Sequence, residues 1–329
     1  MKKHLIALTL TALCASAVQA TTIYEQEGSK LSIGGWVGVR LVNAKAQRTT
    51  LENHASNVDF SIKHQLGNGY SALAYFRLKT KQLKESGDIE LFTEYLYAGI
   101  EKEGVGTLTL GTQRTNGFSA KAGDYTWLTG ENNNVTGGGK KVIKLRSANL
   151  NGWVLGTDYI FRDLKENNTG KKYGYDFYLG YSKKVTDELN LGGRVAYSFD
   201  KNNLKRDEQI IEQTQQSWRV AFTLGYNDFS AAANYGETYQ TPQLGDKTKK
   251  TYVMIATKYR LAKPTALYAQ YLRGTVKTPN KTDSTSNIYS LGIEHKLHKN
   301  VVTWLEGARY LRNDKENDRK IGAGLRVFF

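Results

Sequence analysis

The stretch Leu31-Ser-Ile-Gly-Gly-Trp-Val-Gly-Val-Arg-Leu41 decides how the chain folds, because its apolar residues recur at every second position. A β-strand turns successive side chains to opposite faces, so this spacing gives one apolar face and one polar face. The stretch therefore predicts a long β-strand. The positions of one parity, which form the apolar face, are Leu31, Ile33, Val37, Val39 and Leu41. The positions of the other parity, which form the polar face, include Ser32, Gly34, Trp36 and Arg40.

The same alternation returns along the chain, at residues 58–63, 72–79, 173–181, 189–198 and 218–226. The connections between strand-like segments are short and long in turn. Seven are short, at 66–69, 103–104, 149–152, 184–187, 227–228, 263–264 and 299–300. Eight are long, at 43–56, 82–91, 112–141, 163–171, 200–215, 238–250, 274–286 and 311–318. Seven plus eight connections join sixteen antiparallel strands. Tight turns on one rim and long loops on the other are typical of outer-membrane barrels.

A large soluble β-sandwich is the alternative, since it would bury the apolar parity in a core. It predicts neither the asymmetry between connections nor aromatic residues gathered at strand ends. Tyr181, Tyr226, Phe229 and Tyr259 stand beside short turns, as an aromatic belt at a membrane interface requires. The sequence therefore favours an all-β fold. We expect an antiparallel transmembrane β-barrel with short periplasmic turns and long extracellular loops.

The composition of the 329 residues fits this fold: 32 are Gly and 21 are Tyr, but only 3 are Pro and 2 are Met. Many Tyr and Gly residues with few breakers indicate strands joined by turns. The mean hydropathy is that of a soluble protein, but a barrel with a polar lumen hides its membrane band from such an average.

Residues 1–20 are predicted to be a secretory signal peptide, because two lysines precede an apolar run at 5–13 and small residues end at Ala20. The apolar run is too short to span a bilayer as a helix. The one cysteine, Cys14, lies inside this segment, and the leucine before it argues against a lipid anchor. Cleavage would leave residues 21–329 as an exported barrel domain without a disulfide.

The chain ends in Ile321-Gly-Ala-Gly-Leu-Arg-Val-Phe-Phe329, an alternating strand whose last residue is aromatic. No residue is left over, so this strand must close on the first one. The segment resembles the terminal strand of Gram-negative general porins, which end in Phe. That resemblance spans nearly the whole mature chain and implies an outer-membrane homotrimer. It also rests, in chain order, on Thr22-Ile-Tyr with Gly28 and Lys30, Ala232-Ala-Asn-Tyr-Gly-Glu-Thr238, and Lys299-Asn300 before Thr303-Trp-Leu-Glu306.

The resemblance to porins implies that the long third loop, 112–141, folds into the lumen and forms its constriction. In the family an acidic patch on this loop faces basic wall residues, and the pair sorts solutes by charge and size. The charged residues that we assign to the constriction loop are Lys121, Asp124 and Glu131. The loop lacks the Pro-Glu-Phe-Gly-Gly-Asp run of enterobacterial porins, so the family pattern is only partly present.

The wall of the predicted lumen carries more basic than acidic residues. Asp59 and Glu94 fall where porins often hold arginines, so the arginine ladder of the family is not reproduced there. The balance predicts a mild preference for anions, which a Debye length of about 8 Å keeps modest at physiological salt. The basic residues of lumen parity are Arg40, Lys63, Arg77, Lys79, Lys144, Arg146, Arg194, Arg219 and Arg326, against Asp59, Glu94, Asp176 and Glu306.

No local pattern indicates an enzyme, a metal site or a cofactor site. The five His residues form no pair with metal-ligand spacing, and no signature supports a Ser-His-acid site. Gly137-Gly-Gly-Lys-Lys141 lacks the residues that a phosphate-binding loop needs. Nucleic-acid binding is disfavoured, because the aromatic residues follow the lipid-facing parity.

The predicted function is a water-filled channel for passive diffusion of small hydrophilic solutes and ions. A substrate-selective channel is one alternative, and it would need an aromatic slide or a dedicated binding set in the lumen. The only candidates for such a set are Trp36, Tyr75 and Tyr178, and they are scattered. A structural or adhesive surface barrel with a plugged lumen is another. Lysine-rich loop tips either contact lipopolysaccharide phosphates or are solvated; they lie at 165, 171–172, 201, 205–206 and 247–250.

Overall fold

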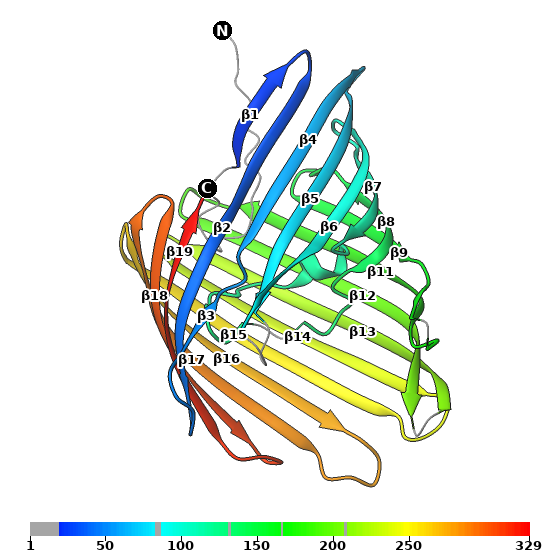
Figure 1. Ribbon diagram of the computed structural model, residues 1–329, viewed down its shortest axis with the longest axis vertical. Coiled ribbons are helices and arrows are strands. Elements are labelled where there is room, and N and C mark those ends of the chain that lie inside the picture. Colours follow the sequence, from blue (N-terminus) through cyan, green and yellow to red (C-terminus); the bar gives the residue numbers. More distant parts are fainter. Residues whose placement is uncertain (1–19, 83–86, 131–132, 166, 207–208) are drawn as a thin grey trace.

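The computed structural model describes residues 20–82, 87–130, 133–165, 167–206 and 209–329. Within these ranges the chain forms one sheet of nineteen strands that closes into a barrel, together with one short 3-10 helix, η1 (Gly117–Ala120) (Figure 1). No helix in the same ranges is long and apolar enough to cross a membrane. The predicted signal peptide lies outside the described residues, apart from Ala20.

Sixteen of the nineteen strands in the described ranges form a closed antiparallel ring, as predicted, because three short ones only add to its edges. Those three are β1 (Thr21–Gln26), β3 (Thr50–Asn53) and β10 (Asp163–Leu164). The ring closes where β19 pairs with β2, with Ile321 opposite Asn43. Its strands are β2 (Ser29–Ala44), β4 (Asn57–Gly67), β5 (Tyr70–Gln82), β6 (Ile89–Lys102), β7 (Gly106–Gln113), β8 (Gly139–Ser147), β9 (Trp153–Ile160), β11 (Gly170–Lys184), β12 (Leu189–Arg206), β13 (Gln209–Tyr226), β14 (Phe229–Pro242), β15 (Thr248–Ala262), β16 (Thr265–Lys277), β17 (Ser284–His298), β18 (Val301–Arg312) and β19 (Asp318–Phe328).

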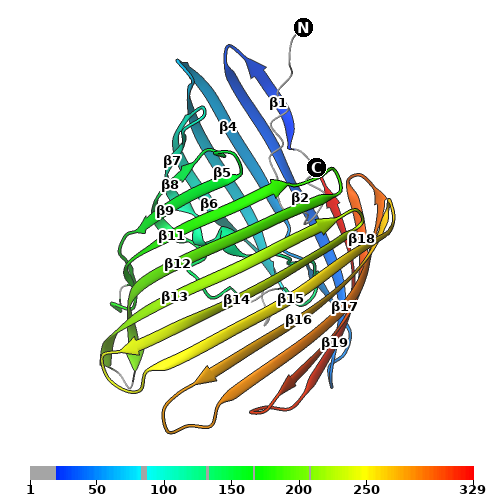
Figure 2. The same cartoon turned by 180° about the vertical axis from the view of Figure 1, so that it is seen from behind.

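The C-terminal residue takes part in closing the ring. Gly35 and Phe329 exchange two backbone hydrogen bonds of 3.1 Å. β1 continues along the same edge of β2, with Thr21 opposite Ile33, and Figure 2 shows β1 beside β2 near the end of β19. Residue 35 must be Gly, because its φ is +147° and a Cβ there would lie 2.3 Å from the carbonyl oxygen of Asn57.

The two rims of the barrel differ as predicted. Tight turns join β4 to β5, β6 to β7, β8 to β9, β11 to β12, β13 to β14, β15 to β16 and β17 to β18. Asn68, Asn151 and Asn227 adopt positive φ in three of these turns. Asparagine tolerates this left-handed conformation because its short polar side chain bonds locally.

Several long connections are shorter than predicted, because the strands continue past the expected boundaries. The prediction of a loop at 200–215 is wrong for most of its length: β12 and β13 stay paired up to Arg206 opposite Gln209, and residues 207–208 lie outside the described ranges. The predicted loops at 82–91, 238–250 and 274–286 are shortened in the same way. Where a hairpin has water on both faces, its strands lack the apolar alternation that reveals a strand in sequence.

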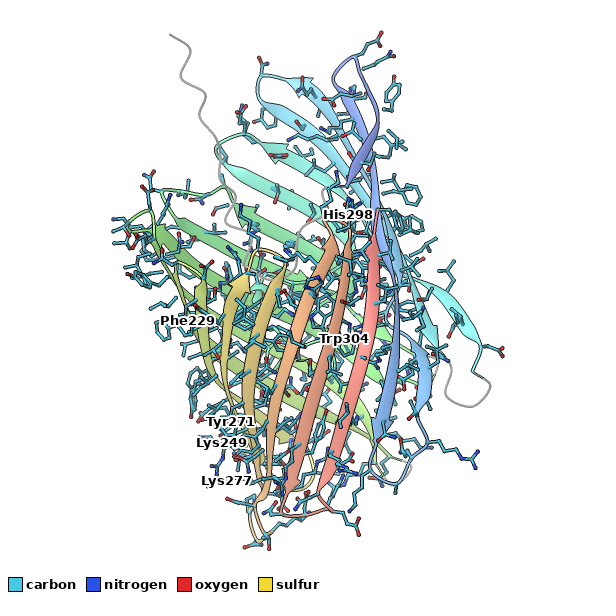
Figure 3. The ribbon with its side chains drawn as sticks, turned by 90° about the vertical axis from the view of Figure 1, so that its left-hand side faces the viewer. Phe229, Lys249, Tyr271, Lys277, His298 and Trp304 are labelled. Atoms are coloured by element: carbon cyan, nitrogen blue, oxygen red, sulfur yellow. The ribbon has the colours of Figure 1, made fainter. Side chains whose placement is uncertain are left out.

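The outer surface of the barrel is an apolar band with aromatic residues at its edge. Phe222 and Leu291 are 64% and 65% exposed. Beside the tight turns, Phe229, which Figure 3 labels, lies opposite Tyr226 on one neighbouring strand and opposite Tyr259 on the other. These rings form the predicted aromatic belt, so the surface suits the acyl chains and interface of a bilayer.

Candidate functional site

The connection between β7 and β8, residues 114–138, folds into the barrel, as predicted for the third loop (Figures 1 and 2). We call these residues loop 3; they begin and end inside the predicted range of 112–141. Side chains on β14, β16, β17 and β18 hydrogen-bond to loop 3. Loop 3 therefore crosses the lumen from the strands that carry it to the opposite side of the ring.

The base of loop 3 is fixed by Asn116, which is fully buried. Its backbone N–H donates to Asp158 Oδ2 at 2.6 Å, and its side chain donates to the carbonyl oxygen of Leu145 at 3.0 Å. Arg146 donates to Asn116 Oδ1 at 3.0 Å. Residue 156 must be small here, because a Cβ on Gly156 would lie 2.3 Å from Asn116 Cγ. Arg146, which we assigned to the lumen wall, thus supports the base of the loop.

The middle of loop 3 is held by amide side chains. Asn234 on β14 accepts from the N–H of Ala122 at 3.0 Å and donates to the carbonyl oxygen of Ala122 at 2.6 Å. On the return path, Asn134 donates to the carbonyl oxygen of Trp218 at 2.8 Å, and Arg219 donates to Asn134 Oδ1 at 2.8 Å. A loop buried inside a barrel needs such partners, since unpaired backbone groups are costly away from water.

The tip of loop 3 is bound by one carboxylate, Glu306 of β18, which is 0% exposed. It accepts the backbone N–H groups of Trp127, Leu128 and Thr129 at 2.6, 3.1 and 3.1 Å, and the Thr129 hydroxyl at 2.7 Å. The Tyr268 hydroxyl is a fifth donor, at 3.0 Å. Hydrogen bonds to an ionised acceptor are the stronger kind, so Glu306 anchors the tip to the wall opposite the base.

Small apolar clusters fill the space between loop 3 and the wall. Tyr125 packs against residues of β15 and β16, and Val135 packs against residues of β11 and β12. Loop 3 therefore covers the inner faces of the strands from β11 to β18. The rest of the lumen is bounded by β19, β2, β4, β5 and β6, and loop 3 reaches this side at Arg326 on β19 and at Tyr95 on β6. The cluster residues are Met254, Ala256, Tyr268 and Leu272 around Tyr125, and Ala120, Tyr178 and Ala196 around Val135.

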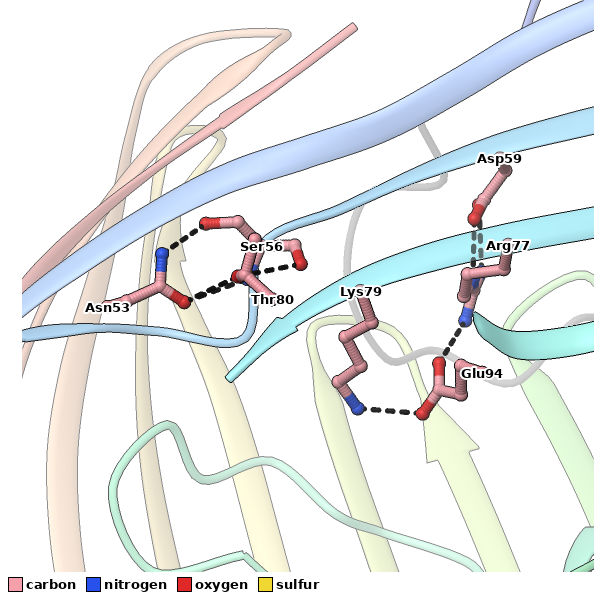
Figure 4. Close-up of polar contacts among 7 residues, drawn as sticks. All are labelled: Asn53, Ser56, Asp59, Arg77, Lys79, Thr80 and Glu94. Carbon is pink, nitrogen blue, oxygen red and sulfur yellow. Dashed lines mark hydrogen bonds and ion pairs between the residues drawn. The ribbon is translucent and has the colours of Figure 1, made fainter. Parts of the chain in front are cut away.

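The wall that faces loop 3 carries a charged network (Figure 4). Arg77 on β5 donates to both carboxylate oxygens of Asp59 on β4, at 2.5 and 2.8 Å, and to Glu94 on β6 at 3.5 Å. Lys79 donates to Glu94 at 2.7 Å. Asp59 and Arg77 meet because they are directly opposite in the register of β4 and β5. Two cations and two anions cancel, so the network is polar but carries no net formal charge.

The remaining wall residues that we predicted lie at other levels of the barrel. Arg40 pairs with Glu52 at 2.8 Å, and Lys63 pairs with a glutamate of β6 at 2.7 Å near the tight turns. Lys144 donates to the carbonyl oxygen of Arg114 at 3.0 Å, at the start of loop 3. These three cations therefore hold local structure as well as lining the lumen.

Two of the three charged residues assigned to the constriction loop are placed by the structure. Asp124 faces a hollow of about 320 Å³ between the loop tip and the wall, which Lys258 and Arg326 also line. The ammonium of Lys121 lies 4.3 Å from the ring centre of Phe118. Glu131 lies outside the described residues.

Guanidinium groups and aromatic rings alternate along the open side of the lumen. Arg77 Cζ lies 5.2 Å from the ring centre of Tyr95 and 5.6 Å from that of Trp36. Arg326 Cζ lies 4.9 Å from the ring centre of Trp36 and 4.7 Å from that of Trp127. We call the whole series the arginine–aromatic arc; its members in spatial order are Phe118, Arg114, Tyr95, Arg77, Trp36, Arg326 and Trp127.

The arc corrects our description of the lumen aromatics as scattered. Trp36 and Tyr75 both lie against Arg77, at 5.6 and 5.8 Å, because the strand register places them on neighbouring parts of one wall. Tyr75 also stacks on Tyr97, with ring centres 5.2 Å apart. Only Tyr178 of the three candidates lies apart from them, beside Arg146. We did not predict four members of the arc, since nothing local in the sequence indicates that they face one another: Arg114, Phe118 and Trp127 of loop 3, and Tyr95 of β6.

His54, in the connection between β3 and β4, lies in the hollow at the loop tip. Its ring centre is 5.6 Å from that of Trp304, and its neighbours Asn53 and Ser56 hydrogen-bond to each other at 2.9 Å (Figure 4). Burial, and then the positive charge of Arg326, lower the pKa of His54 from 6.5 to about 3. His54 is therefore a neutral packing residue at physiological pH.

We expect the free energy of unfolding to fall as pH drops from 6.5 towards about 3, because the unfolded chain then binds a proton that folded His54 does not. The part of this fall in unfolding free energy that arises from His54 should be absent in the His54→Gln variant. Denaturant midpoints of both proteins in detergent, measured at several pH values, test this. His64→Gln, on the exposed part of β4, controls for loss of a histidine. Parallel pH curves for wild type and His54→Gln would contradict the expectation.

The described residues contain no group of three or more His, Cys, Asp or Glu side chains placed to hold a metal ion. The polar chemistry of the lumen consists of ion pairs and of hydrogen bonds that fix loop 3. The arrangement is that of a barrel whose lumen is narrowed by loop 3 and lined by charged side chains.

Comparison with known proteins agrees with this geometry. A family model described as Gram-negative porin matches residues 5–316. The chain is 30% identical to the major outer membrane protein of Pasteurella multocida (strain Pm70) over 356 aligned residues, which cover 100% of both chains.

Solved structures show the same fold. The trimer form of OmpT, an outer membrane protein of Vibrio cholerae, matches with a TM-score of 0.73 at 14% identity, covering 92% of this chain and 100% of that chain. An anion-selective porin from Comamonas acidovorans matches with a TM-score of 0.72 at 15% identity, again covering 92% and 100%. At these identities the likeness concerns the fold alone.

Proposed function

Since this chain belongs to the Gram-negative porin family and forms an outer-membrane channel, we propose that small hydrophilic solutes and ions diffuse through it passively. The observation that carries the proposal is the placement of loop 3. It is fixed at its base, middle and tip, and covers only one side of the lumen. The uncovered side bears charged and polar side chains, as a hydrated passage requires.

The conductance of planar bilayers tests the proposal. The purified protein in a KCl solution should give large, stable current steps. A silent protein would contradict it and favour the alternative of a structural or adhesive barrel. The family and the relatives support a channel over an enzyme; the same preparation, assayed for ester hydrolysis, should show none.

The channel should prefer anions mildly. Arg114 and Arg326 border the opening and form no ion pair within the described residues, whereas the cations of the Arg77 network are balanced by carboxylates. The surplus positive charge at the narrow section favours anions through Coulomb attraction, weakened by salt.

Asp124→Asn should increase the anion preference, because it removes a negative charge from the hollow beside Arg326. The expected change in the anion-to-cation permeability ratio is about twofold, since a unit charge at about 4 Å in water is worth about 1 kcal/mol before screening. The reversal potential in a KCl gradient measures it. An unchanged potential would mean that Asp124 does not border the ion path.

The barrel is proposed to assemble as a homotrimer through the face of β2, β4, β5 and β6. Aromatic rings crowd the outer face from β9 to β17, but β2 presents Val37, Val39 and Leu41. Ala74 and Ala98, opposite each other on β5 and β6, continue this apolar face, which also holds the stacked rings of Phe60 on β4 and Phe76 on β5. The trimer form solved for the Vibrio cholerae relative is compatible with this assembly.

Ala98→Arg should convert the trimer to monomers, because it places a charge in the proposed interface. Ala233→Arg is the matched control. Both alanines point outward, four residues from a tight-turn end of their strands, so both variants bear a similar cost of about 2–4 kcal/mol for a lipid-facing arginine. Native gel migration and light scattering in detergent measure the assembly. Trimers in both variants would exclude this face.

Lipopolysaccharide phosphates are the proposed partners of basic residues near the long-loop rim. Lys249 and Lys277 lie opposite each other on β15 and β16, at the lower end of the barrel in Figure 3. Each also pairs with an acid, Lys249 with Glu237 at 2.8 Å and Lys277 with Asp283 at 3.1 Å. Replacing both lysines by Gln should reduce the lipopolysaccharide that purifies with the protein.

A further inference from the structure

The arginine–aromatic arc surrounds the opening that loop 3 leaves. Phe118 and Trp127 are its two ends, and both belong to loop 3; the rings between them, Tyr95 and Trp36, belong to β6 and β2. Each step along the arc is a guanidinium within 4.0 to 5.6 Å of a ring centre. Every solute that passes between loop 3 and this wall therefore meets flat, polarisable surfaces.

The three arginines of the arc differ in their charge balance. Arg77 is bound by two carboxylates, at 2.5 Å from Asp59 and 3.5 Å from Glu94. Arg114 and Arg326 make ring contacts but no ion pair within the described residues. The arc thus offers a neutralised centre between two cations that form no ion pair with any of the described residues.

Each of these two cations opens onto a hollow that also contains an aromatic member of the arc. Arg114 and Tyr95 line one of about 420 Å³, and Arg326 and Trp127 line the other, of about 320 Å³. These volumes lie in the range of small-molecule sites. A carboxylate can pair with the guanidinium in either hollow while a ring attached to it stacks on the aromatic side chain.

We propose that the arc is a binding track for planar aromatic carboxylates, which it retains and passes more efficiently than aliphatic anions of equal charge and size. The charge is recognised by Arg114 and Arg326, and the flat ring by the faces of the aromatic side chains and of Arg77. This specificity rests on the proposed diffusion function, because the ligand must enter the same opening.

The test compares two monoanions that differ mainly in the flatness of the ring, benzoate and cyclohexanecarboxylate. Each is added to one side of a bilayer that contains the full-length mature channel in KCl, and the reduction of the KCl current is recorded against concentration. Benzoate should reduce the current saturably, at about three- to tenfold lower concentration than cyclohexanecarboxylate, because ring and guanidinium contacts favour it. Equal effects of the two anions would overturn the proposal.

Variants locate the effect. Tyr95→Leu and Trp36→Leu, singly and together, should bring the two anions closer to equality. Tyr70→Leu is the control, because Tyr70 also contacts a cation, Lys102 at 4.2 Å, but lies beside a tight turn outside the arc. Unheated gel migration reports whether each variant folds, and the wild-type comparison stands without any variant. A benzoate preference that survives the double substitution would place the binding track elsewhere.

The same recordings separate two kinds of failure. A wild-type protein without KCl conductance would refute the diffusion function. A conducting channel that treats benzoate and cyclohexanecarboxylate alike would leave that function intact and refute only the binding track.

Discussion

Glu306→Ala should give a channel with larger and noisier current steps than the wild-type channel, because the tip of loop 3 loses its anchor. The substitution leaves three backbone N–H groups and two hydroxyl groups without their shared acceptor. Removing one side of a buried charged interaction typically costs about 3–5 kcal/mol. Most of this cost falls on loop 3, since the strand ladder of β18 does not use the carboxylate. Single-channel recordings in KCl measure the result.

A milder variant and a control variant test whether the increased current noise arises from the loop tip. Glu306→Gln keeps one acceptor oxygen and should loosen the tip less, at a cost of about 1–3 kcal/mol for the unsatisfied donors. Glu101→Gln removes a carboxylate that pairs with Lys63 away from loop 3, so its current noise should match that of the wild type. Wild-type noise in Glu306→Ala would mean that other contacts, such as the 2.7 Å hydrogen bond from Gln270 to the carbonyl oxygen of Gly130, hold the tip alone.

The wall of the barrel was predictable because its signal is local. The alternation in 31–41 needs only neighbouring residues, and the same is true of the tight turns with their asparagines. Closure of the last strand on the first was predictable for a similar reason, because residues 321–329 alternate like a wall strand; the structure adds that Phe329 pairs with Gly35. A paired strand with water on both faces shows no alternation of polar and apolar residues. For this reason β12 and β13 extend further than predicted.

The interior of the barrel was less predictable, because its contacts join residues far apart in sequence. Trp127 and Glu306 are 179 positions apart, and parity alone shows only that Glu306 points inward. The family resemblance implied that the third loop folds inward, but not which side chains hold it. Asn116, Asn134 and Asn234 carry no sequence signal that separates a loop anchor from a solvated amide.

The arginine–aromatic arc was unpredictable for the same reason, because its members are far apart in sequence. Trp36 and Tyr95 become members of one surface because Arg77 lies directly opposite Tyr95 in the sheet register, and its guanidinium also reaches Trp36. A shift of one residue in this register would turn Tyr95 toward the lipid. Sequence parity gave the correct face for Trp36 and Tyr75, but only the three-dimensional register gives their proximity.

The Arg114→Gln/Arg326→Gln double variant should lose most of the anion preference that we propose. These two cations border the opening without an acid partner in the described residues, so their removal takes away surplus charge and leaves the Arg77 network balanced. A charge at about 4 Å is worth about 1 kcal/mol in water. After screening, we expect the anion-to-cation permeability ratio to fall by about two- to fivefold.

The reversal potential in a KCl gradient measures this change, and a charge-matched variant controls it. Lys183→Gln/Lys299→Gln removes the same formal charge from exposed positions beside the tight turns, so its reversal potential should stay near the wild-type value. If both double variants shift the potential equally, the net charge of the whole protein sets the selectivity. If only Arg114→Gln/Arg326→Gln shifts it, the selectivity arises where loop 3 narrows the lumen, since a charge beyond a Debye length of about 8 Å is largely screened.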